Sequence, residues 1–365
     1  MDYIFIVNNI LIAVLVFEMR GFEDKAPIRL HLSVLSKRAN CILGLYKAIL
    51  SSILITVKAH HITVRVGKLP CGTWYFEIPF YSSSQDNNNV VWNLEGSTIQ
   101  VKRSHYPPQT HFVLSADGNA VALFGKLLRH LTSSHSIQNC FECKFYAIPD
   151  GVISQLESNY IYDKIDIGND RLEGVTPEDL RFLLEHLRAK VLRLNVECLP
   201  ISIYKYEKHG DKDSLIQKLI IGSYSWVNFA ELPSIRVISI WREGLHQMNT
   251  ILKSWIAGKN RQMEIGDFEL GKYSERNREI IFTGVESDTT SLTTAERNAF
   301  LSSESHFPNI KALRDIVALD ITREEDWLRA TVIEATTGPS SQPTQKMFVM
   351  VWSDANLRTI GRIVD

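Results

Sequence analysis

Short strand-like runs recur through the middle of the chain at nearly regular intervals. They begin near Lys144, Lys164, Val191, Lys218, Arg236 and Met263. The successive starts lie 20, 27, 27, 18 and 27 residues apart, and each interval has room for one helix. Alternating strands and helices at such a period can bury their apolar faces only against neighbouring units. The spacing therefore predicts parallel strands along one side of a stack.

Two of the intervals contain clear helix signals. One helix should begin after Thr176, a capping residue, with Pro177 at its first position and two carboxylates behind it. The second should end at Gly258. The buried stripes of the two helices are Leu180, Leu183, Leu184 and Leu187, and Met248, Ile251, Leu252, Trp255 and Ile256. A repeat of about 20–29 residues is typical of leucine-rich repeats, so we expect a leucine-rich-repeat-like curved stack, which is a binding surface.

The flanking sequence completes an α+β or α/β architecture. Helical spacing is expected at the N-terminus, β-branched and aromatic strands follow it, and two strands, Arg329–Ala335 and Lys346–Trp352, are expected near the C-terminus. The expected organisation is 1–50, a small helical module; 51–140, a β-rich segment plus a helix; 141–283, the repeat-like region; 284–306, a long loop; and 307–365, C-terminal strands.

Composition narrows the classes of partner. The formal net charge is -1, from 40 basic and 41 acidic residues, so no basic field marks a nucleic-acid-binding protein. The five cysteines are scattered and odd in number, and no Asn-x-Ser/Thr sequon occurs, which favours a cytoplasmic or nuclear location. The apolar stretch Ile4–Phe17 lacks a basic flank and a small-residue cleavage site. A buried helix accounts for it better than a signal peptide or membrane anchor.

Three segments resemble parts of the large nematode F-box families. Leu32–Ala39 (LSVLSKRA) is similar to a segment of their F-box. Leu219–Leu270, within an expected family core of 209–270, resembles their type 2 F-box-associated domain through the pieces GSYSWV and LKSWIAGKN. The C-terminal pieces DITR, ATV and FVMVW look like that family's C-terminal pattern. The matching residues in the associated domain are Trp226, Leu252, Trp255, Ile256, Gly258 and Asn260.

This resemblance implies a non-catalytic, substrate-recruiting adaptor of an SCF-type ubiquitin ligase. The F-box would dock on a Skp-type adaptor and thereby on the cullin ligase, and the associated domain would capture an unknown target protein. The resemblance implies no active site, cofactor or metal. The residues expected to contact the Skp-type adaptor are Leu15, Val16, Phe17, Leu30, Leu32, Leu35, Lys37 and Arg38.

Departures from the family pattern keep alternatives open. F-boxes generally open with a Leu-Pro pair, whereas no proline precedes Pro27 here, and Gly21 with extra charges stands where the family has a hydrophobic helix end. The main alternative is a repeat-scaffold interaction module with no ligase role. A secreted or membrane-tethered repeat protein follows, and an enzyme comes last.

One motif suggests chemistry. Cys140 and Cys143 form a C-x-x-C pair with His130 and His135 upstream, but a zinc site needs a second ligand pair. We therefore predict two half-buried thiols at the start of a strand. Trp226, Trp241 and Trp255 are expected to be core residues, although each could be a partner anchor. The common hydrolase and nucleotide-binding signatures do not occur.

Overall fold

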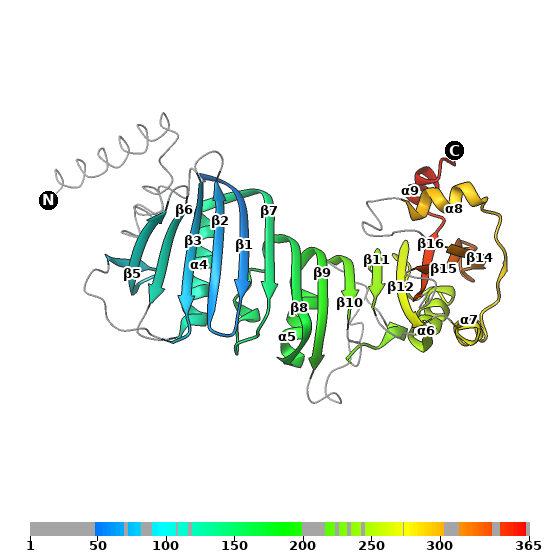
Figure 1. Cartoon of the computed structure of the whole chain (residues 1–365), viewed down its shortest axis with the longest axis horizontal. Coiled ribbons are helices and arrows are strands. Elements are labelled where there is room, and N and C mark those ends of the chain that lie inside the picture. Colours follow the sequence, from blue (N-terminus) through cyan, green and yellow to red (C-terminus); the bar gives the residue numbers. More distant parts are fainter. Residues whose placement is uncertain are drawn as a thin grey trace. The chain divides into compact units, whose positions relative to one another are not determined.

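A computed structural model describes residues 48–68, 72–81, 90–106, 109–115, 119–198, 216–222, 226–231, 235–241, 245–272, 274–302, 314–337 and 344–362. The fold is mixed α/β, with strands predominating (Figure 1). The chain divides into two compact units, Met1–Asp166 and Ile167–Asp365. The division falls within strand β8 (Ile161–Val175). The residues expected to contact a Skp-type adaptor lie outside the described residues.

The first unit is built on a mixed sheet with the strand order β7-β1-β2-β3-β6-β5-β4. The pairs β1–β7 and β3–β6 are parallel, and the other neighbours are antiparallel. Its strands, several of them expected from their β-branched and aromatic runs, are β1 (Ala48–Val57), β2 (His61–Lys68), β3 (Gly72–Pro79), β4 (Val90–Leu94), β5 (Ser97–Tyr106), β6 (Gln109–Ser115) and β7 (His135–Phe145).

Helix α4 (Ala120–Ser134) supplies the apolar layer against one face of this sheet (Figure 1). It begins at Asn119, whose side chain accepts a hydrogen bond of 2.8 Å from the Val121 amide. The helix expected within 51–140 is confirmed, and its apolar stripe is buried: Leu123, Phe124, Leu127, Leu128 and Leu131. The helix is therefore held by packing rather than by propensity alone.

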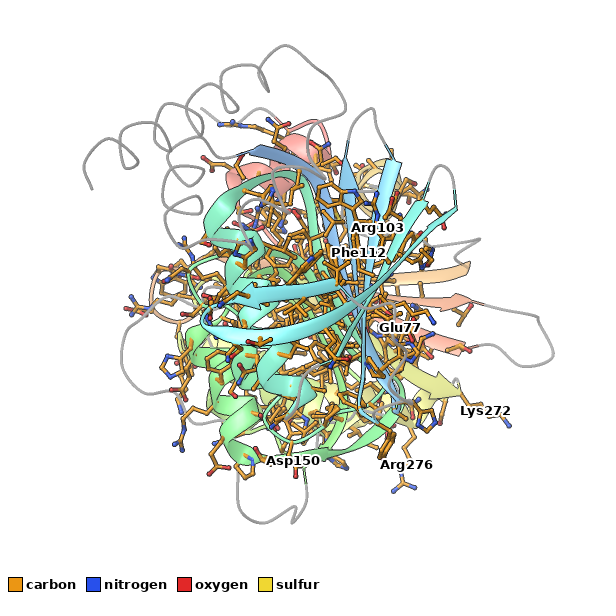
Figure 2. The ribbon with its side chains drawn as sticks, turned by 90° about the vertical axis from the view of Figure 1, so that its left-hand side faces the viewer. Glu77, Arg103, Phe112, Asp150, Lys272 and Arg276 are labelled. Carbon is orange, nitrogen blue, oxygen red and sulfur yellow. The ribbon has the colours of Figure 1, made fainter. Side chains whose placement is uncertain are left out.

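Alternation along the strands separates core from solvent in this unit. Phe112 of β6 is buried and stacks on Phe76 with ring centroids 5.1 Å apart. Glu77 of β3 and Arg103 of β5 are exposed (Figure 2). Because side chains alternate between the two faces of a strand, a shift of one residue in register would bury these charges.

Four parallel strands form the centre of the second unit. They are β9 (Arg188–Cys198), β10 (Ile216–Ile221), β11 (Val237–Ile240) and β12 (Ile265–Lys272), and each pairs in parallel with the next. The parallel pairing predicted from the repeat spacing is confirmed for these strands. The strand predicted to begin near Lys144 is wrong, because β7 pairs with β1 from His135 and ends at Phe145.

The helices between strands β7 to β12 differ in length. Thr176 caps α5 (Pro177–Arg181) as predicted, since its hydroxyl accepts a 3.1 Å hydrogen bond from the Asp179 amide. A π-helical turn, η3 (Phe182–His186), continues α5. The second predicted helix is α6 (Leu245–Ile256). Short 3₁₀ turns, η2 (Ile153–Gln155) and η4 (Phe229–Glu231), lie in two other intervals, whose described residues hold less helix than the spacing allows.

The C-terminal strands extend the sheet of the second unit. The two predicted strands are confirmed as β15 (Arg329–Thr337) and β16 (Thr344–Val351), and β16 pairs antiparallel with β12. Two strands not predicted, β14 (Arg314–Thr322) and β13 (Asp288–Thr289), continue the order β12-β16-β15-β14-β13. The repeat-like strands and the C-terminal strands therefore belong to one sheet.

The long loop predicted over 284–306 is wrong. It contains β13 and helix α8 (Thr294–Leu301), and α7 (Glu275–Phe282) precedes it. The abundance of Thr and Glu in this segment suggested a loop. Two of these residues, Thr293 and Glu296, instead form the capping box of α8. Phe300 and Leu301 of α8 pack with Ile360, which follows α9 (Asp354–Thr359), over buried side chains of the sheet.

The carboxylate of Glu296 joins α8 to the end of the chain. It accepts hydrogen bonds from Arg362 Nε at 2.6 Å and from the Thr293 amide at 2.7 Å. The Arg362 hydrogen bond, followed by those from Thr293, lowers the pKa of Glu296 to about 2. Because its pKa is lower in the folded protein than in the unfolded chain, the ionised carboxylate stabilises the fold at pH values above the usual glutamate pKa. This stabilisation is lost as the pH falls towards the folded pKa.

We expect Glu296→Gln to lower the free energy of unfolding at pH 7 by about 1 kcal/mol, the usual worth of a helix cap. The difference from wild type should shrink between about pH 5 and pH 2, because Glu296 is protonated first in the unfolded chain and only near pH 2 in the folded protein. Thermal unfolding of both proteins, measured between about pH 7 and pH 2, tests this pH dependence. A difference that grows in acid would contradict the assigned role.

Within the part of the chain that the structure describes, no helix has the length and apolar character needed to cross a bilayer.

Candidate functional site

The residues that carry the family resemblance are mostly structural in the second unit. Trp226, Leu252 and Trp255 are buried at 1%, 0% and 0% exposure, and Ile256 is half-buried. Asn260 is also buried. Helix α6 and the η4 segment pack together, and Ser254 Oγ donates a 3.0 Å hydrogen bond to the Ala230 carbonyl. Trp226 and Trp255 are therefore core residues, as predicted, whereas Trp241 is half-buried and carries the Arg193 guanidinium 4.5 Å from its ring centroid.

The end of α6 is shaped by Gly258. Its φ is +74°, a conformation that favours glycine. The Lys259 amide donates back to the Ser254 carbonyl at 3.0 Å, which closes the last turn. A Cβ at position 258 would lie 2.7 Å from a carboxylate oxygen of Glu325. The glycine thus ends the helix and lets the β14–β15 loop approach it.

That loop, residues 323–328, is docked on the end of α6. The Arg323 guanidinium lies 5.4 Å from the Trp255 ring centroid and donates to the Arg261 carbonyl at 3.4 Å. The Glu324 amide donates to the Ile256 carbonyl at 3.1 Å, and Arg261 pairs with Glu325. Two of the motif segments quoted from the sequence, LKSWIAGKN and DITR, therefore meet in one place.

Hydrogen bonds inside the loop fix its path. Arg323 and Asp326 form a two-pronged ion pair, with Nε to Oδ1 at 2.9 Å. Asp326 Oδ1 also accepts from the Leu328 amide at 3.2 Å. The Arg323 hydrogen bond is the largest cause that lowers the pKa of Asp326 to about 2. The carboxylate therefore stays charged across the physiological range.

The loop presents Trp327 to solvent. Its side chain is 79% exposed, and its φ of +59° is unusual for a residue other than glycine. The Trp327 amide donates to the Arg323 carbonyl at 3.1 Å, which holds this backbone in place. An exposed tryptophan on a strained turn that is held by hydrogen bonds is a candidate contact residue.

A groove of about 790 Å³ lies beside Trp327. Its lining joins the α7–β13 connection to the β14–β15 hairpin. The lining residues are Glu286, Ser287, Asp288, Asp320, Thr322, Arg323, Glu324, Trp327 and Arg329. Its volume lies within the range of small-ligand sites.

The charged groups of the groove fall into two sets. Asp320 is buried and accepts from Thr331 Oγ1 at 2.7 Å and from the Ser291 amide at 3.2 Å. Arg323 is engaged by Asp326. Glu286, Asp288, Glu324 and Arg329 are exposed. The first set is structural, while the second faces solvent and can meet an incoming group.

Sequence reasoning missed this groove. The quoted C-terminal pieces stop at Arg323 and resume at Ala330, so Trp327 falls between them. The Asp-Trp-Leu sequence just before the expected strand Arg329–Ala335 was a usable signal, since connecting segments lie on the surface and often carry binding residues. The acidic residues of the α7–β13 connection lay in the segment that we expected to be a loop.

The C-x-x-C motif forms no shared site. Cys140 and Cys143 lie within the last six residues of β7 rather than at a strand start, and Cys143 is fully buried. A separation of three places their side chains on opposite faces of the strand. Burial is the main cause that raises the pKa of both thiols. Among the described residues, no group of three or more His, Cys, Asp and Glu side chains is arranged to hold a metal ion.

Comparisons with known proteins give no family. No family model and no curated protein matches the sequence. One solved structure, an S-adenosylmethionine-dependent methyltransferase from Clostridium acetobutylicum ATCC 824, is similar over 58% of this chain at 7% identity, with a TM-score of 0.12. The match covers 66% of that chain. A TM-score this low gives the likeness no weight for either fold or activity.

Proposed function

We propose that this chain is a non-catalytic adaptor that recruits a target protein to an SCF-type ubiquitin ligase. The segment 1–50 would dock on a Skp-type adaptor, and the second unit, with its leucine-rich-repeat-like run of parallel strands, would hold the target. Such an adaptor acts by raising the effective concentration of the target near the ubiquitin-loaded enzyme.

One observation carries the target-binding half of this proposal. Trp327 stands 79% exposed beside a groove of about 790 Å³, on a loop anchored by Arg323 to Trp255. Interface energy concentrates in a few aromatic and arginine anchors, and a fixed anchor loses little conformational entropy on binding. The support for the ligase half is the resemblance of Leu32–Ala39 to an F-box segment.

The departures in the first 27 residues favour a second candidate. Without the Leu-Pro pair typical of an F-box, the chain would be a repeat-scaffold interaction module with no ligase role. The target-binding surface would be the same in both candidates, so only the adaptor contact separates them.

We expect the full-length chain to co-purify with a Skp-type adaptor and Leu32→Asp/Leu35→Asp to abolish the capture. Two buried carboxylates in an apolar interface would lack partners, which is strongly unfavourable. The matched control is Val90→Asp/Val91→Asp, which adds the same charge at two exposed valines of β4.

Circular dichroism establishes that each preparation is folded. Loss of capture in the first variant alone supports the ligase adaptor. No capture by folded wild-type protein contradicts it and leaves the interaction module.

A further inference from the structure

We infer that the groove beside Trp327 binds an arginine- or lysine-bearing segment of the target protein, with the indole as the platform for the cationic side chain. The inference deepens the target-binding half of the proposed function and rests on it. It commits to a basic peptide segment as the occupant.

The exposed indole of Trp327 is the first reason to expect a cationic occupant. Trp327 is the most exposed of the large hydrophobic side chains in the described part of the chain, at 79%. Tryptophan has the strongest attraction for cations among the aromatic rings, and arginine can also stack flat on it. The loop's hydrogen bonds and the Arg323–Asp326 ion pair fix the backbone of Trp327 before any partner binds.

The excess negative charge of the groove lining is the second reason to expect a cationic occupant. Four acidic residues line the groove against two arginines. Arg323 pairs with Asp326, whereas Arg329 is exposed and keeps its charge 5.6 Å from the Trp352 ring centroid, so the lining as a whole still carries excess negative charge. Glu286, Asp288 and Glu324 are exposed and make no side-chain hydrogen bond or ion pair with the residues that the structure describes.

These two features select a cation over the alternatives. An acidic segment would meet three exposed carboxylates against the one exposed guanidinium of Arg329, which costs binding energy and slows association. A neutral apolar segment would gain the indole contact but would leave the carboxylates partly desolvated without partners. A guanidinium or ammonium group suits both the indole and the carboxylates, because it can face the ring while donating a hydrogen bond to a carboxylate.

The test is calorimetric titration of the full-length chain with three capped dodecapeptides. One carries four arginines spaced by alanine and serine, the second has lysine in their place, and the third has glutamate. We expect the two basic peptides to bind and the glutamate peptide not to. Binding should weaken at least several-fold when the salt rises from about 50 mM to about 500 mM, because exposed charges are screened.

Two variants separate the indole from the charges. Trp327→Ala should weaken binding of the arginine peptide about 10-fold or more, as for an interface anchor. Trp327→Phe should recover part of it, because a smaller ring still attracts a cation. Glu286→Gln/Asp288→Asn/Glu324→Gln should weaken binding and flatten its salt dependence.

The controls change the same chemistry elsewhere. Tyr81→Ala removes an aromatic that is 75% exposed in the first unit. Glu77→Gln/Asp150→Asn/Glu178→Gln removes three exposed negative charges outside the groove. Both should bind the arginine peptide as wild type does.

Each outcome bears on a different claim. Equal binding of the glutamate peptide, no binding of either basic peptide, or binding that survives Trp327→Ala overturns the inference, while capture of the Skp-type adaptor can still hold. Binding of the basic peptides with loss in Trp327→Ala upholds the inference even where that capture fails.

Discussion

Trp255→Ala is expected to lower the free energy of unfolding of the second unit by about 3–5 kcal/mol, the cost of truncating a buried tryptophan. The side chain is 0% exposed on α6 and lies beneath the Arg323 guanidinium. Removing it opens a cavity between the helix and the β14–β15 loop. Native-state hydrogen exchange, read at the amides of α6 and β12, measures the loss.

Trp255→Phe is the matched control. The indole Nε1 has no hydrogen-bond partner among the described residues, so phenylalanine loses volume without orphaning a bonded group. We expect it to cost less than half as much as alanine. A Trp255→Ala protein with wild-type exchange at α6 would show that the indole does not hold the helix.

Arg323→Ala is expected to cost about 2–3 kcal/mol and also to abolish binding at the groove. Its side chain is 6% exposed and makes an ion pair with Asp326, a hydrogen bond to the Arg261 carbonyl and a contact with Trp255. Charge-assisted hydrogen bonds and a desolvated cation–π contact each contribute about 1–3 kcal/mol, partly offset by the cost of burying the guanidinium. Losing them frees the loop that carries Trp327.

The control for this variant is Arg261→Ala. Its side chain is 65% exposed and pairs with Glu325 at the surface, so its loss should cost less than about 1 kcal/mol. Chemical denaturation gives the stability of both variants, and titration with the arginine peptide gives the binding. Wild-type peptide affinity in Arg323→Ala would mean that the loop needs no anchor to present the indole.

Periodicity determined much of the local structure. The apolar stripe of α4, the cap of α5 at Thr176 and the end of α6 at Gly258 follow from residue types at fixed spacing. Recurrence of strand-like runs predicted the parallel pairing of β9 to β12. These features depend on neighbours within a few residues or on a regular repeat, which a single sequence displays directly.

The errors arose where a local signal had two meanings. The Thr and Glu residues near 293 are common in loops, yet they cap α8, whose Phe300 and Leu301 are buried against the sheet. The expectation of two half-buried thiols at a strand start is wrong for Cys143, which is fully buried near the end of β7. Propensity does not decide such cases, because tertiary burial overrides it.

The groove depended on tertiary structure altogether. Apolar spacing along the chain predicted many of the strands, helices α4, α5 and α6 and the burial of Trp226 and Trp255. Only the folded chain brings Glu286 and Asp288 to the same groove as Trp327, some 40 residues along the chain. The antiparallel pairing of β13 with β14 and of β14 with β15 brings these residues together. Pairing between distant segments leaves no local periodicity in the sequence, so the groove could not be predicted from it.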